Sequence, residues 1–320
     1  MASATNGTAA AAAAAAFDAH GTLGALSVGV LISSFLFGIV TVQAYIYYTR
    51  FPEDQMKLKL LVGVVWLFEL AHCISICHSL YSLTISSYGN PRALVRPPST
   101  LFLAIIFSGV IGPLVQAFFA ERVRVVSGQL IIPIICWTLS AVRLAMSLVA
   151  ASEAFQMTTL AQYQKEWKWL LTTVLAIGAA VDIIVAAALC YHLRVQRANS
   201  HEKTAMMIDK IIAWTIQTGL MTSLTGLVML ICFLAMPGNF VWLAFFMFLA
   251  RMFSNSLLAS LNARSILRSN KFVELQPSQG STFNASSNTR YPQSQVSVRM
   301  TKLTEVTTDT KADPNYNDMA

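Results

Sequence analysis

Four ionisable side chains lie inside long apolar stretches of the sequence, where charge is uncommon. Two are acids, Glu69 and Asp182, and two carry guanidinium groups, Arg143 and Arg251. A charge near the centre of a bilayer is costly when it faces lipid, so such residues normally turn inward and pair with one another. Because the four charges sum to zero, we expect them to surround one interior site.

Arg251 is expected to form the principal ion pair of this site. Its partner is Glu69 or Asp182, directly or through water, because a buried guanidinium must keep its hydrogen bonds satisfied. Glu69 is favoured if the last helix meets the first two in a closed ring. Arg143 is then expected to pair with the other acid or to reach toward the outer interface.

The sequence around Arg251 places further polar residues on the same helical face. At 100° per residue, Arg251, Asn255 and Asn262 lie within about 60° of one another, so they form one stripe that should face the bundle. Two interpretations stay open: hydrogen bonds that fix helix packing, or a site for a small molecule or ion. The candidate interior site comprises Glu69, His72, Arg143, Asp182, Arg251, Asn255 and Asn262.

Metal, cofactor and enzyme chemistry are not expected. Cys73, Cys77 and His72 lie close in the sequence, but the group lacks the further ligands of a closed zinc site. A retinal Schiff base requires a lysine in the last apolar stretch, and none occurs between Lys210 and Lys271. The chain's 5 histidines are too few and too scattered for the ligand cluster of a membrane hydrolase. We therefore expect no catalytic residue, no metal and no cofactor.

The elements that must position these residues are membrane-spanning helices. The chain is 55% hydrophobic and 12% charged, whereas about 25% charge is usual in soluble domains. The apolar residues gather in blocks of the roughly 20 residues that a helix needs to cross a bilayer. We therefore predict an all-α integral membrane protein with a seven-transmembrane-helix bundle. The predicted spans are Leu23–Tyr48, Leu60–Leu83, Ser99–Ala120, Leu130–Ala151, Trp169–Leu193, Ile211–Met236 and Phe240–Leu261.

The distribution of Lys and Arg predicts an N-terminus outside and a cytoplasmic C-terminus, because cytoplasmic loops retain positive charge. One set of connections, together with the segment after the last span, carries twelve such residues and the other set carries four. The twelve are Arg50, Lys57, Lys59, Arg122, Arg124, Arg194, Arg197, Lys203, Lys210, Arg264, Arg268 and Lys271, and the four are Arg92, Arg96, Lys165 and Lys168.

This basic face has two expected roles. Its charge explains the net +7 and the isoelectric point of about 9.3 as a surface set against anionic lipid, so nucleic-acid binding is not expected. It also provides a candidate surface for coupling to a cytoplasmic partner. The candidate coupling residues are Arg122, Arg194, Arg197, Lys203, Arg264 and Arg268.

The bundle is expected to occupy residues 23–264, between two polar or low-complexity tails. Residues 1–22 include an alanine run, and residues 275–320 are rich in Ser, Thr, Asn, Gln and Pro, so both are predicted to be disordered. Residues 265–274 form a basic juxtamembrane segment between the bundle and the second tail.

Three stretches resemble signature sequences of a known family. They are YYTRFPED at residues 47–54, QAFFAER at 116–122 and NSLLASLNAR at 255–264. Together they make residues 20–270 similar to a membrane family of mushroom-forming fungi, domain of unknown function 6534. The resemblance implies a seven-helix integral membrane protein with no assigned activity, and it implies no catalytic residues.

The expected function is that of a receptor-like or sensor-like bundle with an interior polar site. Its expected partners are the lipid bilayer and a small-molecule ligand, and the plasma membrane is its expected location. A small-molecule transporter is the alternative. A receptor should couple through the basic loop 194–210, whereas a transporter should show saturable uptake into vesicles.

Overall fold

All regular structure in the described part of the chain is helical. The computed structural model of the protein describes residues 20–88, 97–156, 159–198, 202–236 and 239–274. Within these ranges, 7 helices are long and apolar enough to cross a membrane, which confirms the predicted fold class. The spans are built on α2 (Ala25–Arg50), α3 (Met56–Tyr81), α5 (Ser99–Ser127), α6 (Ile131–Gln156), α8 (Lys168–Ala198), α9 (Glu202–Ala235) and α10 (Val241–Glu274).

Shorter helical elements extend or connect the spans. The π-helical turn η1 (His20–Gly24) precedes α2, and η2 (Ser82–Ser86) follows α3. The short helix α7 (Leu160–Glu166) was not predicted, because its sequence LAQYQKE is mostly polar. Thr159 caps α7 by accepting a hydrogen bond from the Gln162 backbone N–H at 3.1 Å.

The structure can be compared with the predicted segment boundaries at both ends of the bundle. The backbone of residues 265–274, predicted as a separate juxtamembrane segment, continues α10 without a break. The disorder predicted for residues 1–22 and 275–320 concerns positions that, apart from residues 20–22, lie outside the described residues.

The outer faces of the spans are apolar, as contact with lipid requires. Large hydrophobic side chains such as Leu31, Phe35, Leu67 and Leu220 are exposed in the middle of their helices. A water-soluble bundle would bury these side chains and place charge on its outer faces. The exposed apolar surface therefore fits an integral membrane protein.

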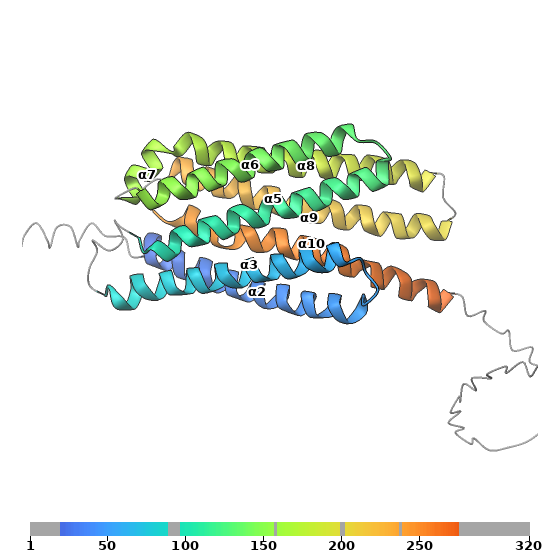
Figure 1. Ribbon diagram of the computed structural model, residues 1–320, viewed down its shortest axis with the longest axis horizontal. Coiled ribbons are helices and arrows are strands. Elements are labelled where there is room, and N and C mark those ends of the chain that lie inside the picture. Colours follow the sequence, from blue (N-terminus) through green and yellow to red (C-terminus); the bar gives the residue numbers. More distant parts are fainter. Residues whose placement is uncertain (1–19, 89–96, 157–158, 199–201, 237–238, 275–320) are drawn as a thin grey trace, which may run out of the picture. The chain divides into compact units, whose positions relative to one another are not determined.

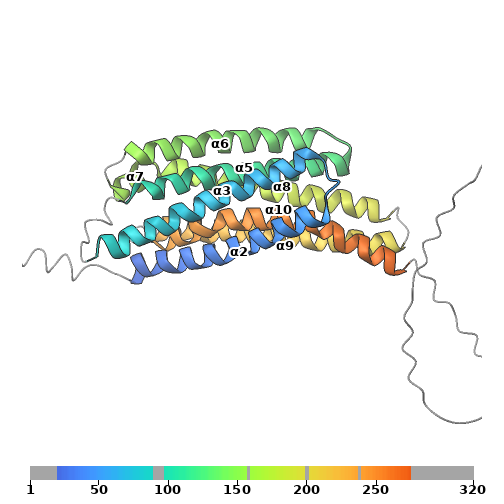
Figure 2. The same cartoon turned by 60° about the horizontal axis from the view of Figure 1, so that its bottom comes forward.

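The helix α10 runs through the middle of the bundle (Figures 1 and 2). It packs against α2, α3, α5 and α9, and it is the most buried of the seven spans. The pair α2 and α3 lies on one side of α10, whereas α6 and α8 lie beyond α5 and α9 (Figure 1). The two faces of α10 therefore meet different sets of helices.

The helices α2 and α10 pack closely. A Cβ atom built at Gly29 would lie 2.6 Å from the Cα of Ala244, so only glycine permits this approach. Farther along, Asn255 Nδ2 donates to the Leu36 carbonyl at 3.4 Å and Asn262 Nδ2 donates to the Gln43 carbonyl at 2.9 Å. Because the residue numbers of both partners increase together from contact to contact, α2 and α10 run parallel.

Candidate functional site

The predicted ion pair between Arg251 and Glu69 is present at the interface of α10 and α3. Arg251 Nη1 contacts Glu69 Oε2, and the same nitrogen donates to the Glu69 carbonyl oxygen at 2.8 Å. Both side chains are 0% exposed. Because α10 packs against both α2 and α3, Glu69 of α3 is the acid within reach of Arg251.

Further hydrogen bonds join the ion pair to α2 and α3. Arg251 Nε donates to Ser33 Oγ at 3.1 Å, and Arg251 Nη2 lies 3.2 Å from His72 Nδ1. Ser254 Oγ donates to Glu69 Oε1 at 2.5 Å, so both carboxylate oxygens have partners. The Phe37 ring also lies 5.0 Å from the Arg251 guanidinium carbon. Three helices are therefore tied together through one arginine.

The polar groups of α10 that face α2 and α3 form a polar seam. It consists of the Arg251–Glu69 ion pair, the contacts of Asn255 and Asn262 with α2, and the buried His72. Each side chain that the sequence placed on the stripe bonds to a neighbouring helix. This geometry favours the packing interpretation over a ligand site for Glu69, His72 and Arg251, which are fully buried. Asn255 and Asn262 bond to α2 but also line a cavity between α2, α5, α9 and α10.

The expectation that all four charges surround one site was wrong. Arg251 faces α2 and α3, whereas Phe253, two residues later and on the opposite face of α10, contacts Arg143. A separation of two residues turns a helix by about 200°. The body of α10 therefore stands between the Arg251–Glu69 pair and the second pair of charges, Arg143 and Asp182.

Arg143 lies in a slot between two glycines. A Cβ built at Gly178 of α8 would lie 2.8 Å from Arg143 Cζ, and a Cβ built at Gly112 of α5 would lie 3.1 Å from Nη1. The Phe253 ring closes a third side, with its centroid 5.2 Å from Cζ. The guanidinium is thus held by two backbones and an aromatic ring.

Asp182 lies nearby on α8, but it does not form an ion pair with Arg143, which was one of the two arrangements expected for this arginine. Its Oδ1 accepts a hydrogen bond from Gln116 Nε2 at 2.7 Å, and its Oδ2 accepts one from Thr222 Oγ1 at 2.8 Å. Gln116 also donates to the Gly178 carbonyl at 2.9 Å. Asp182 attracts Arg143 electrostatically, but neutral donors on α5 and α9 satisfy its oxygens.

Arg143 therefore keeps unused donors. The side chain is only 7% exposed, yet its Nε and Nη1 have no hydrogen-bond partner within the described part of the chain. A buried N–H without an acceptor is costly, and such groups normally find one.

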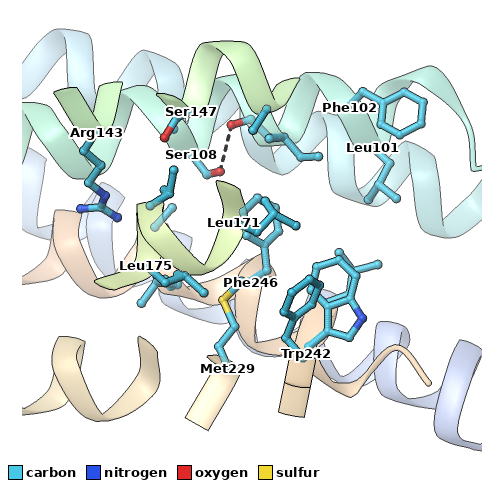
Figure 3. Close-up of a pocket in the computed structure, with 18 of the residues that line it drawn as sticks. Leu101, Phe102, Ser108, Arg143, Ser147, Leu171, Leu175, Met229, Trp242 and Phe246 are labelled. Carbon is cyan, nitrogen blue, oxygen red and sulfur yellow. Dashed lines mark hydrogen bonds between the residues drawn. The ribbon is translucent and has the colours of Figure 1, made fainter. Parts of the chain in front are cut away.

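An apolar cavity extends from Arg143 toward the end of the bundle that carries α7 (Figure 1), and Figure 3 shows its lining. It has a volume of about 90 Å³, several times the roughly 10–15 Å³ that a single water needs. In Figure 3 the Arg143 guanidinium lies at one end of the cavity, and Leu101, Phe102 and Trp242 lie toward the other. The walls come from α5, α6, α7, α8, α9 and α10 and are almost entirely hydrocarbon and aromatic.

Tyr163 of α7 contributes to the wall near the end of the bundle. Its hydroxyl donates to the Ala150 carbonyl at 2.9 Å and so fastens α7 to α6. Burial, with a smaller contribution from the charge of Glu153, raises the pKa of Tyr163 well above its ordinary value. The hydroxyl therefore stays protonated and keeps this hydrogen bond.

A second cavity, of about 530 Å³, lies toward the other end of the bundle, among α2, α5, α9 and α10. Arg122 and Arg264, two of the candidate coupling residues, line it. Arg122 Nη1 donates to Ser260 Oγ at 2.5 Å, and Arg264 Nη2 pairs with Asp54 Oδ2 at 2.5 Å. The structure thus brings these two arginines to the wall of one cavity, whose lining is otherwise largely apolar.

The other candidate coupling residues do not line this cavity, and the side chains of two of them are outside the described residues. Arg194 is exposed on α8, and Arg197 pairs with Asp209 of α9 at 2.6 Å. The side chains of Lys203 and Arg268 are outside the described residues.

Sequence reasoning missed three residues of this site. Gly112 and Gly178 contact the Arg143 guanidinium, and Gln116 donates a hydrogen bond to Asp182. Glycines inside apolar spans often mark close helix approach, and this signal was available at both glycines. The identity of the approaching group was not, since Arg143 is 31 residues from Gly112 and 35 from Gly178 in the chain.

Comparison with known proteins agrees with the family resemblance over the last part of the bundle. Residues 178–266 match the family described as "Family of unknown function (DUF6534)". This stretch runs from the middle of α8 through α9 and most of α10, so it includes Gly178, Asp182 and Arg251. No curated protein and no solved structure is significantly similar to the chain.

Proposed function

We propose that this multi-pass membrane protein is a receptor-like or sensor-like bundle that binds a small, largely apolar molecule in the cavity next to Arg143. The observation that carries the proposal is the cavity itself, which five spans and α7 enclose with aromatic and aliphatic side chains. Ligand sites in helix bundles are typically concave and apolar with a few placed polar groups. The proposal includes no enzymatic activity.

The proposed route of coupling is α10. Residues of α10 from Trp242 to Phe253 line the apolar cavity, and residues from Met252 to Arg264 line the second cavity. A ligand that favours one position of α10 would therefore change the second cavity as well. With the N-terminus outside, as the Lys and Arg distribution predicts, the apolar cavity faces outward and the second cavity faces the cytoplasm.

The same arrangement supports a small-molecule transporter as the second candidate. Alternating access exposes one site to each side of the membrane in turn, and two cavities toward opposite ends of the bundle, both lined by α10, are compatible with such a path. A transporter would move its substrate past Phe253, which lines the apolar cavity and contacts Arg143.

Binding can be tested with the full chain in phosphatidylcholine nanodiscs, by ligand-dependent thermal stabilisation against a panel of apolar and amphipathic compounds. Leu175 lines the cavity, whereas Leu220 is exposed on the outer face of α9. Leu175→Trp should fill the cavity and abolish the stabilisation, and Leu220→Trp should leave it unchanged. Equal stabilisation of both variants by every active compound would contradict the proposal.

Transport is tested separately in proteoliposomes with each compound that binds. Saturable uptake that Leu175→Trp abolishes and Leu220→Trp preserves would establish the transporter. Binding without uptake would leave the receptor-like function.

A further inference from the structure

We propose that the ligand of the apolar cavity is an amphipathic carboxylate, and that Arg143 binds its carboxylate group. This inference rests on the proposed function, because it names the chemical class of the molecule that the cavity takes. The apolar walls would hold the hydrocarbon part of the ligand.

The first support is the state of the Arg143 guanidinium. It is buried, and its Nε and Nη1 donors have no partner in the described part of the chain. A guanidinium is a planar fork that matches the two oxygens of a carboxylate, and it remains charged under all ordinary conditions. These two donors have no acceptor in the described part of the chain, and a carboxylate would supply two acceptor oxygens.

The second support is that the nearby acid is already engaged. Gln116 and Thr222 donate to the two oxygens of Asp182, so that carboxylate does not need Arg143 for its hydrogen bonds. This contrasts with the Arg251–Glu69 pair, in which the guanidinium and the carboxylate satisfy one another. Arg251 is thus surrounded by hydrogen-bond partners, whereas Nε and Nη1 of Arg143 have none in the described part of the chain.

The third support is that the slot holds the guanidinium in place before any ligand binds. Gly112 and Gly178 bound it on two sides and Phe253 on a third, and it stands beside the apolar cavity. A preorganised donor loses little conformational freedom when it binds, which favours affinity.

The shape of the cavity indicates an elongated ligand. Along α10 its wall runs from Phe253, beside Arg143, to Trp242, eleven residues away. At about 1.5 Å per residue this distance is about 16 Å. A carboxylate carrying a medium-length alkyl chain or a small ring system fits a site with its polar group at one end.

The experiment uses the full chain in phosphatidylcholine nanodiscs, with radiolabelled decanoate as the probe and empty nanodiscs as the background. We expect saturable decanoate binding. Decanol, which has the same chain without the charge, should compete at least tenfold more weakly than unlabelled decanoate, because the lost contact is a charge-assisted hydrogen bond.

Three variants separate the contact from the fold. Arg143→Gln should weaken decanoate binding by roughly tenfold or more while leaving decanol competition unchanged. Gly178→Ala keeps the charge but places a methyl group against the guanidinium, so it should also weaken decanoate binding. Arg124→Gln, an exposed arginine paired with Glu121, is the matched control and should bind decanoate normally.

Two results would overturn the inference. If decanol competes as well as decanoate with the unaltered protein, the guanidinium does not recognise a carboxylate. If decanoate shows no saturable binding above empty nanodiscs, the cavity does not take this class. Either result leaves the Leu175→Trp experiment to decide the proposed function independently, and the decanol comparison needs no variant that could fail to fold.

Discussion

The buried pair of Arg251 and Glu69 should couple strongly in a double-mutant cycle. Replacing Arg251 by Met removes the partner of a carboxylate that is 0% exposed, together with the donors to Ser33 and to the Glu69 carbonyl. Removing one member of a buried ion pair typically costs about 3–5 kcal/mol, because the other charge is left uncompensated. We expect Arg251→Met to lower the free energy of unfolding by about this amount.

Glu69→Gln should destabilise the protein for the reciprocal reason, although the new amide can still accept from Ser254. In the double variant neither charge remains buried without a partner. Its loss of stability should therefore be smaller than the sum of the single losses by about 2–3 kcal/mol.

The assay is unfolding by sodium dodecyl sulfate in mixed micelles, followed by tryptophan fluorescence. The matched control is a cycle on Arg197 and Asp209, whose side chains are 51% and 46% exposed, with the replacements Met and Asn. An exposed pair contributes at most about 1 kcal/mol after screening by solvent. A coupling energy for Arg251 and Glu69 no larger than that of the surface pair would refute the reasoning.

Three further predictions concern packing, topology and the C-terminal tail. Gly29→Val should destabilise the bundle by about 1–3 kcal/mol in the same unfolding assay, because α10 backbone lies against Gly29, whereas Gly38→Val, with open space around it, should be nearly neutral. Expression in a eukaryotic host should give a glycan at Asn6 that Asn6→Gln removes, and a glycan at Asn284 would show that the predicted orientation is wrong. Deletion of residues 276–320 should leave a monodisperse protein in size-exclusion chromatography, and aggregation of the truncated chain would show that the tail supports the fold.

Much of the fold could be predicted because its causes are local in the sequence. The length of each apolar block sets the seven spans, and the period of the helix places Arg251, Asn255 and Asn262 on one stripe. The cost of exposing a guanidinium to lipid then requires an acid beside Arg251. Glu69 as the partner rested on an assumed ring in which the last helix meets the first two. The contacts of α10 with α2 and α3 are present, although α10 lies in the middle of the bundle and not in a ring.

The tertiary structure decided what happens to the other two charges. Counting charges could not reveal that α10 stands between the two groups, because that depends on which face of the helix each neighbour covers. Nor could it show that Gln116 and Thr222 donate hydrogen bonds to the Asp182 carboxylate, since those donors come from α5 and α9. Hydrogen bonds between side chains far apart in sequence depend on the packing of whole helices, and no local pattern encodes them.

The sequence by itself thus determined a membrane bundle with a polar seam along its last helix, since hydrophobicity and helical period act within each segment. Only the tertiary structure decided that Arg251 is closed by its partners and that Arg143 is not. The physical reason is steric: Gly112 and Gly178 leave room for a guanidinium only because α5 and α8 approach α6 at the same depth. That shared depth is a property of three helices together.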